Sequence, residues 1–231
     1  KAEECPAFAG HFFMAIKGLF STPFYSVSTE ERLLSAEVSR VCLEHESDAF
    51  KKAQPPQGEI PNVFESQFDF LAWTPQPVKD LRRLILSHLT AFIAVANEKT
   101  PEEIQQYPFS YHSWFHISRS GGYFRPHSHP LASWSAVFCA DPGQSAGNGA
   151  SDGHLVFYDP RHNASMFLDR TNREMRREFA FSSTKLKLNY GDLVIFPSYM
   201  MHFVEPYQGE TPRITVAANF WINEFNHEQS N

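Results

Sequence analysis

Two histidines separated by one residue, His127 and His129, are the first candidates for chemistry, and they lie in the segment PHSHP. An extended segment alternates its side chains between two faces, so both imidazoles point the same way, about 6 to 7 Å apart at the backbone. Two such imidazoles can converge on one metal ion. Because the chain has 11 histidines, a pair of this kind also arises incidentally, and a metal site requires a further ligand.

The further ligand candidate is His202, which lies 73 residues after His129 in the segment GDLVIFPSYMMHFV. An apolar run is followed there by a Pro-Ser turn and a new strand that carries His202. In a jelly roll, strands this far apart in sequence can lie side by side. The sequence therefore allows three histidines to meet at one site.

An arginine eleven residues after His202 suggests what binds beside the metal. Alternation along TPRITVAANFWIN places Arg213, Thr215 and Asn219 on one face. An arginine among apolar strand residues is costly to bury without an anion, and its planar fork matches a carboxylate. The pattern favours a dicarboxylate that chelates the metal at one end and binds Arg213 at the other. An edge-strand Arg213 paired with Glu205 or Glu210 is the alternative.

The elements that must position these residues divide the chain into a helical first half and a strand-rich second half. Ser28 and Glu31 form a capping-box pattern that predicts a helix over about 29–50, and a second helix follows Thr74-Pro75. His88 interrupts the apolar stripe of that helix and is interpreted as a satisfied helix residue. Alternating or apolar runs predict strands over 111–118, 123–129, 132–140, 153–158, 184–188, 192–197, 200–205 and 212–222.

About eight short strands after two helices predict an α+β fold, with a double-stranded β-helix (a cupin-like jelly roll) and N-terminal helices packed on its outside. The 231 residues, of which 42% are hydrophobic, suffice for one such domain. A net charge of −6 gives no basis for a nucleic-acid partner. Three widely spaced cysteines form no disulfide framework, and no apolar run suits a membrane span, so we expect a cytoplasmic protein.

Four segments in order carry a family resemblance: HSHP with SWSAVF, then GHLVFYDPR, GDLVIFPSYMMHFV and PRITVAANFW. Together they resemble the Fe(II)- and 2-oxoglutarate-dependent oxygenases, over about residues 111–222. The N-terminal segment IKGLFSTPFYS resembles the opening of the same branch. The resemblance implies that Met14 is a natural start, that residues 1–13 are an extension, and that 14–231 form one domain with its helical part at about 29–97.

Residue by residue, the resemblance implies that His127 and His202 are iron ligands and that Arg213, assisted by Thr215, binds the C5 carboxylate of 2-oxoglutarate. The implied cofactors are Fe(II), 2-oxoglutarate as cosubstrate, and O2. The implied reaction hydroxylates a substrate, with desaturation and ring formation as other outcomes, and releases succinate and CO2. We expect a small-molecule substrate rather than a protein, no membrane partner, and leave a homo-oligomer open.

The sequence departs from the wider superfamily at residue 129, where most members carry Asp or Glu. His129 allows three hypotheses: it is itself a ligand in a three-histidine site, a carboxylate of Asp141, Asp152 or Asp159 replaces it, or the scaffold binds no metal. A neutral imidazole also removes one negative charge from the metal's ligands.

Five further residues are candidates for the substrate pocket or for hydrogen bonds to the ligands: Trp114, His116, Tyr123, Trp134 and Asn219. For the aromatic residues, burial in the core of the sandwich is the default alternative. Two other functions are also compatible with the sequence. One is a cupin-like three-histidine enzyme that does not use 2-oxoglutarate, such as a thiol dioxygenase or an isomerase. The other is a noncatalytic jelly-roll binding module.

Overall fold

The computed structural model describes residues 3–4, 13–14, 18–53, 62–144, 152–161, 169–176 and 179–222. It divides into one unit of Lys1–Thr22 with Arg161–Ser182 and a second of Pro23–Pro160 with Ser183–Asn231. In the first unit, β1 (Glu3–Glu4) pairs antiparallel with β2 (Phe13–Met14). The predicted extension at 1–13 lies mostly outside the described residues, and its boundary with a single domain at 14–231 stays a prediction.

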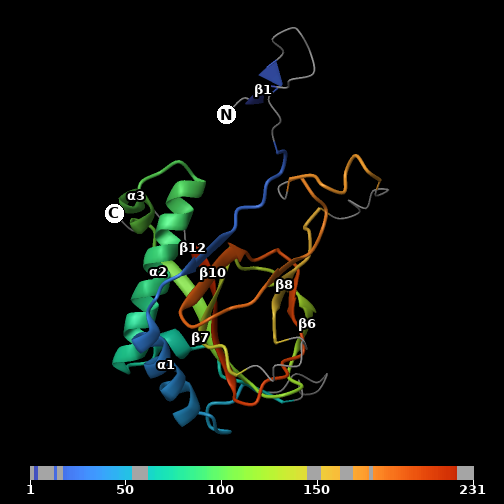
Figure 1. The fold of residues 1–231 in the computed structure, drawn as a ribbon. Helices are drawn as coiled ribbons and strands as arrows, with labels where there is room; N and C mark the ends of the chain where they lie inside the picture. Colours follow the sequence, from blue (N-terminus) through green and yellow to red (C-terminus); the bar gives the residue numbers. More distant parts are fainter. Residues whose placement is uncertain are drawn as a thin grey trace, which may run out of the picture. The chain divides into compact units, whose positions relative to one another are not determined.

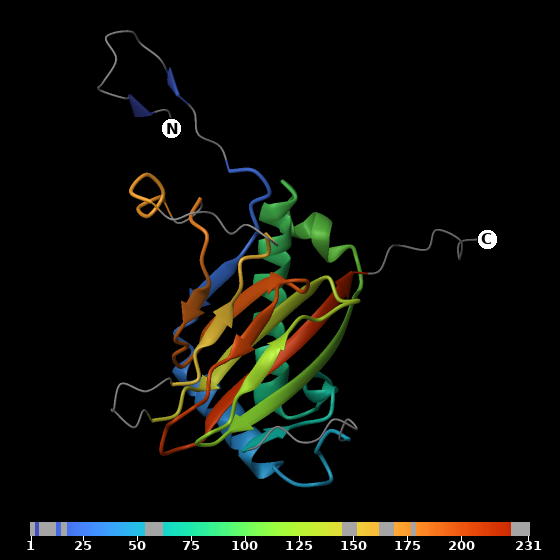
Figure 2. The same cartoon turned by 90° about the vertical axis from the view of Figure 1, so that its right-hand side faces the viewer.

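The second unit contains two antiparallel sheets that together form the predicted jelly roll. The larger sheet has the order β3 (Tyr25–Ser28), β10 (Asp192–Pro197), β7 (Trp134–Asp141), β12 (Arg213–Ile222), β5 (Phe109–Ser118) and β4 (Val63–Glu65). The smaller sheet, toward the viewer in Figure 2, has the order β6 (Phe124–His127), β11 (His202–Val204), β8 (Leu155–Phe157) and β9 (Thr184–Leu186). The two sheets form an open sandwich.

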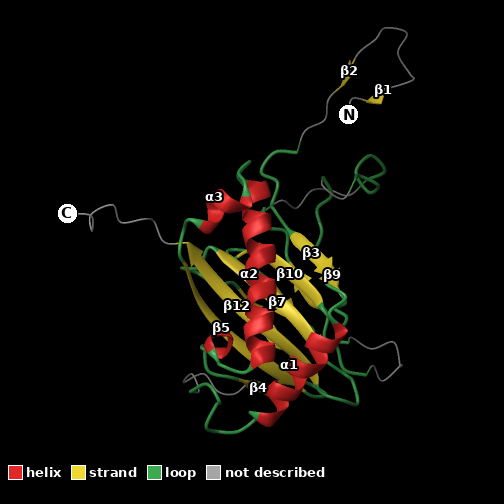
Figure 3. Ribbon diagram, turned by 90° about the vertical axis from the view of Figure 1, so that its left-hand side faces the viewer, coloured by secondary structure: helices red, strands yellow, loops and turns green. Residues whose placement is uncertain are grey.

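Helices cover the outer face of the six-stranded sheet. Helix α2 (Gln76–Ala96) runs across this face beside α1 (Arg32–Glu44), with the 3-10 turn η1 (Phe70–Ala72) and α3 (Pro101–Gln105) near its two ends (Figure 3). Leu81, Ile85 and Leu89 recur at a spacing of four residues, which places them on one face of α2. All three are buried in the cluster that also contains Phe115 and Val216 of the sheet. Figure 1 shows the resulting order of layers: helices, large sheet, small sheet.

Strand alternation divides the interior into two cores. On β7, Phe138 belongs to the core between helices and sheet, whereas its neighbour Cys139 belongs to the core between the two sheets. The intersheet core includes Leu155, Phe196 and Met200. The inner face of β5 and β12 instead carries the polar residues His116, Arg213, Thr215 and Asn219.

All eight predicted strands are present, six of them one or two residues shorter at one or both ends. The predicted helix after Pro75 is α2, and His88 is satisfied as predicted, because the Tyr25 hydroxyl lies 2.8 Å from its Nδ1. The capping-box prediction is wrong. Ser28 instead ends β3, opposite Asp192, and α1 begins only at Arg32, without a side-chain cap. Strand β4 was not predicted either.

No helix in the described part of the chain is long and apolar enough to cross a membrane.

Candidate functional site

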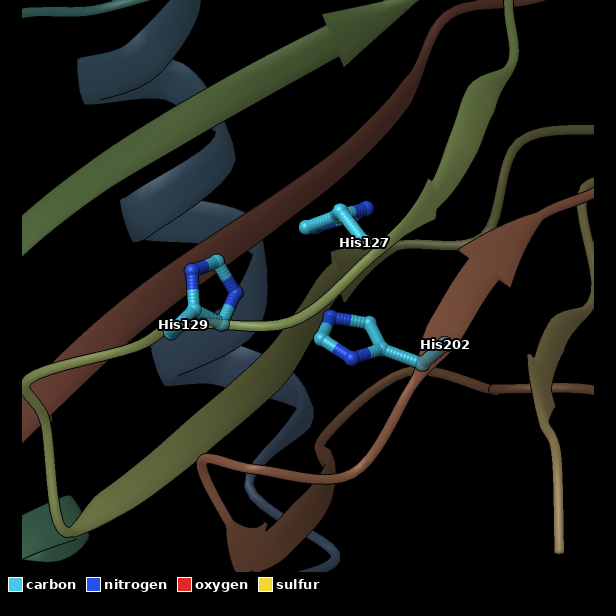
Figure 4. Close-up of side chains that lie close together, drawn as sticks. All are labelled: His127, His129 and His202. Atoms are coloured by element: carbon cyan, nitrogen blue, oxygen red, sulfur yellow. The ribbon is translucent and has the colours of Figure 1, made fainter. Parts of the chain in front are cut away.

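The three predicted histidines meet between the two strands at one edge of the small sheet. His127 is the last residue of β6 and lies opposite His202, the first residue of β11. His129 follows β6, and its backbone N–H donates to the carbonyl of Ser198 at 2.9 Å, which ties it to the loop that precedes β11. One nitrogen from each ring lies within 4.8 Å of the others, and Figure 4 shows the rings facing a common centre.

Hydrogen bonds to the backbone fix which nitrogen two of the rings can offer. His127 Nδ1 lies 2.7 Å from the carbonyl oxygen of Arg125, and His202 Nδ1 lies 2.9 Å from that of Met200. Since a carbonyl only accepts, both Nδ1 atoms carry the proton in the neutral rings. Each Nε2 therefore keeps its lone pair, which is the arrangement that orients histidine ligands in metal sites.

Burial keeps two of these rings neutral. The pKa of His202 is lowered to about 3, chiefly by desolvation and also by the neighbouring His127. Desolvation is also the largest cause that lowers the pKa of His129 to about 4, with contributions from His127 and Lys52. Both rings are unprotonated at neutral pH and can bind a cation without first losing a proton.

Arg213 lines the same cavity and is itself a buried cation. It begins β12, its exposed fraction is 4%, and burial lowers the pKa of its guanidinium, which still remains charged at neutral pH. No carboxylate of the described residues forms an ion pair with it. The predicted alternative partner Glu205 pairs with Lys185 at 2.5 Å and lies 3.2 Å from His154.

Thr215 and Gly153 complete the surroundings of Arg213. Thr215 lies two residues along β12 on the same face and is also buried. Gly153 precedes β8 and approaches the Arg213 stem so closely that a Cβ there would lie 3.2 Å from Cδ. A buried guanidinium with a hydroxyl beside it and no acidic partner among the described residues is suited to bind an anionic ligand.

Three of the other predicted residues line this cavity. Trp114 Nε1–H donates to His116 Nε2 at 3.0 Å, and desolvation holds the pKa of His116 well below its ordinary value. Ser135 donates its hydroxyl proton to Asn219 Oδ1 at 2.7 Å. This bond leaves the Asn219 amide N–H groups directed elsewhere, as donors available to a ligand.

Tyr123 and Trp134 are not brought to the cavity. Trp134 lies on the opposite face of β7, where it packs edge-on against Phe92 of α2. Tyr123 is half-buried just before β6 and is not among the lining residues.

Ser135, Gly153 and the ion pair of Lys52 with Glu65 were not predicted from the sequence. The Glu65 carboxylate lies 4.0 Å from His116 because β4 pairs with β5, and Lys52 follows through its backbone N–H bond to the Glu65 carbonyl at 2.9 Å.

The alternative carboxylate ligands do not join the three histidines. Within the described ranges, no aspartate or glutamate belongs to the group. Asp141 instead accepts a hydrogen bond from the Gly143 backbone at 2.8 Å, and Asp152 pairs with Lys187 at 3.4 Å. The candidate donor set among the described residues is therefore three imidazoles, which suits a divalent transition metal such as iron, nickel or zinc.

Comparisons with known proteins agree with this geometry. Residues 112–219 match the family model described as "Putative 2OG-Fe(II) oxygenase". No curated protein matches the chain in sequence.

Among solved structures, a prolyl-4-hydroxylase from Pseudomonas putida is similar with a TM-score of 0.58 and 12% identity, over 88% of this chain and 94% of that one. HygX from Streptomyces hygroscopicus, with nickel, 2-oxoglutarate and hygromycin B bound, is similar with a TM-score of 0.54 and 16% identity, over 87% and 83%. The 2-oxoglutarate-dependent epimerase SnoN from nogalamycin biosynthesis gives 0.54 and 13%, over 87% and 76%.

Proposed function

We propose that the chain is a 2OG-Fe(II) oxygenase, on the match of residues 112–219 to that family, and we propose which residues hold the cofactors and what class of substrate is oxidised. The enzyme is a 2-oxoglutarate-dependent dioxygenase whose cofactors are Fe(II), 2-oxoglutarate and O2. Bound together, these supply the oxidative decarboxylation of 2-oxoglutarate to succinate and CO2 and the oxidation of a substrate C–H bond.

His127, His129 and His202 hold the iron in this proposal. The observation that carries it is the convergence of one nitrogen from each ring within 4.8 Å, with both carbonyl-bonded rings presenting Nε2. Three protein ligands leave other coordination positions open for cosubstrate and O2, which is what a catalytic metal site requires. His129 takes the position that a carboxylate occupies in most of the superfamily.

Arg213 binds the C5 carboxylate of 2-oxoglutarate, and Thr215 adds a hydrogen bond to it. The guanidinium is buried without an acidic partner among the described residues, so a carboxylate would supply the missing counter-charge through two parallel N–H···O bonds. The apolar walls around it, including Leu155 and Phe196, exclude water and strengthen this attraction.

Trp114, His116 and Asn219 shape the remaining wall. His116 is neutral and accepts the Trp114 indole proton, so the pair fixes the Trp114 ring rather than transferring protons. We propose that the substrate is a small molecule that is hydroxylated. HygX has hygromycin B bound and SnoN is an epimerase from nogalamycin biosynthesis, whereas a prolyl hydroxylase from Trichoplax adhaerens that is similar in fold is in complex with a peptide fragment.

An anaerobic titration tests the site directly. Addition of Fe(II) and 2-oxoglutarate to the chain should produce the weak visible charge-transfer band of a chelated 2-oxoacid. His202→Ala should abolish the band and the retained iron, because a lost ligand weakens the metal site. His112→Ala, which changes an exposed histidine outside the three, should leave both unchanged. A wild-type protein that retains no iron and shows no band would overturn the proposal.

Turnover is measured as succinate formation in the presence of candidate small molecules and peptides, because decarboxylation reports the reaction whatever the product. The alternative of a three-histidine enzyme without 2-oxoglutarate is not favoured by the family match. It makes the opposite prediction: Arg213→Ala would keep activity, and succinate would never form.

A further inference from the structure

Four aromatic side chains extend the inner face of the large sheet beyond the metal-site cavity. On paired strands, His112 lies opposite Asn219, and Trp221 comes two residues further along β12 on the same face. The His112 and Trp221 rings meet edge-on with centroids 5.0 Å apart. Phe68 contacts Trp114 edge-on at 4.9 Å and stacks beside His112 at 6.2 Å. We call Phe68, His112, Trp114 and Trp221 the aromatic strip.

Exposure is lowest at the cavity end of the strip. Trp114 has an exposed fraction of 6%, Trp221 is half-buried, Phe68 reaches 40% and His112 is exposed. At its inner end, the Trp114 ring lies 5.7 Å from the ring of His129. The strip is therefore an open platform that ends at the proposed iron ligands, so a ligand lying on it extends toward the metal.

The two indole N–H groups of the strip already have partners, and the exposed ring surface of the strip belongs to Phe68, His112 and Trp221. Trp114 donates its indole proton to His116, and Trp221 donates its own to the carbonyl of Leu131. Aromatic faces bind other flat rings by stacking, whatever the ring's substituents. The platform thus selects for a planar ring rather than for a particular hydrogen-bonding group.

The polar groups around the strip define two further properties of the ligand. Ser135 donates to the Asn219 side-chain oxygen, and no acceptor among the described residues binds the Asn219 amide N–H groups. A ligand acceptor atom can therefore bind there. Lys52 lies over the Phe68 ring at 4.5 Å and is paired with Glu65 at 2.9 Å. Since this pair has no net charge, it does not attract an ionic ligand to the edge of the strip.

We propose, on the basis of the function assigned above, that the substrate is an uncharged small molecule with a planar ring and an oxygen acceptor beside it. The ring stacks on Trp221 beside Phe68 while the acceptor binds the Asn219 amide, and the buried Trp114 forms the inner end of the platform. The oxidised C–H bond then belongs to the part of the ring system, or to a substituent on it, that reaches past Trp114 toward His129.

Calorimetric titration of the full chain with Ni(II) and 2-oxoglutarate present tests this with a matched pair of probes, coumarin and its fully saturated counterpart octahydrocoumarin. Coumarin should bind at least about fivefold more tightly than the saturated compound, which has the same acceptor but no planar ring. Trp221→Ala should weaken coumarin binding at least about fivefold. Tyr158→Ala, which removes a half-exposed ring stacked on Phe203 elsewhere, should change it less than about twofold.

Equal binding of the two compounds, binding of neither, or an unchanged coumarin affinity in Trp221→Ala would overturn the inference. If Trp221→Ala does not melt cooperatively, Phe68→Ala replaces it with the same expected loss. Binding of Ni(II) and 2-oxoglutarate is measured first in the same samples. Its failure would contradict the proposed function, whereas its success without ring selectivity would contradict only the ring-bearing substrate.

Discussion

Gly153→Ala tests whether the position of the Arg213 side chain, and not only its charge, sets the affinity for 2-oxoglutarate. Gly153 has φ +66, a left-handed conformation that costs an alanine about 1 to 2 kcal/mol. Its new Cβ would lie 3.2 Å from Arg213 Cδ and 3.4 Å from Nε. Optimal carbon contacts begin at about 3.5 Å, so one of the two groups must move by about 0.3 Å.

The glycine loop is the less free of the two. Asp152 pairs with Lys187 at 3.4 Å on one side, and the Glu205 N–H donates to the His154 carbonyl at 3.0 Å on the other. We therefore expect Arg213 to shift and its short bonds to the carboxylate to lengthen. The expected result is an increase of about tenfold in the dissociation constant of 2-oxoglutarate, or about 1.4 kcal/mol.

The assay is calorimetric titration of 2-oxoglutarate into protein loaded with Ni(II). Gly191→Ala is the matched control, because Gly191 has φ +76 but its Cβ would meet Thr29 and Glu31 instead of the cavity. It should lose a similar amount of stability and keep its affinity. A folded Gly153→Ala protein that binds 2-oxoglutarate within about twofold of the wild type would refute the reasoning.

Three further changes test other parts of the structure. Arg213→Gln should weaken 2-oxoglutarate by about a hundredfold or more while leaving Ni(II) bound, as measured by the same titrations, because the buried carboxylate loses its charged partner; equal losses of both ligands would indicate misfolding instead. His129→Asp should hold Ni(II) more tightly and the anionic cosubstrate less tightly, since it adds one negative charge between them. Burial lowers the pKa of His88, so its imidazole is harder to protonate in the folded than in the unfolded protein. Its contribution to the free energy of unfolding is complete above about pH 6.5 and is lost as the pH falls from there toward the lowered pKa. Urea unfolding at pH 7.5 and 5.5 should show a smaller loss for His88→Gln, and an identical loss would contradict this origin.

The strands and the spacing of the candidate ligands could be predicted because both depend on local patterns. Period-two alternation decides which face of β12 carries Arg213 and Thr215, and the structure keeps that alternation from Arg213 to Trp221. The same alternation could not predict which face of β7 lines the cavity, because a strand that is buried on both faces has no polar face to distinguish it. Trp134 therefore had no signal to separate it from Ser135.

What could not be predicted depends on contacts between distant segments. Ser28 and Glu31 match a capping box locally, but β3 pairs with β10 across more than 160 residues of sequence, and the Thr29 hydroxyl donates to the Gly191 carbonyl at 2.8 Å. That pairing satisfies the backbone that the cap would have used, so tertiary structure overrides the local preference. The aromatic strip is hidden for the same reason, since Phe68 reaches β5 from a separate loop.

The charge of the cavity explains why three histidines are compatible with a cosubstrate of two negative charges. None of the described residues that line it is acidic, and the nearby Glu65 is neutralised by Lys52. A divalent metal held by the three histidines would keep its full double charge, to which Arg213 would add a third. A dicarboxylate that spans both positions neutralises two of these charges within a low-dielectric space, where attraction is strong. A site with a carboxylate at residue 129 would bind the metal by its own charge, whereas this one leaves more of the metal's attraction for the cosubstrate. We therefore expect metal retention to depend more strongly on 2-oxoglutarate in the wild type than in His129→Asp.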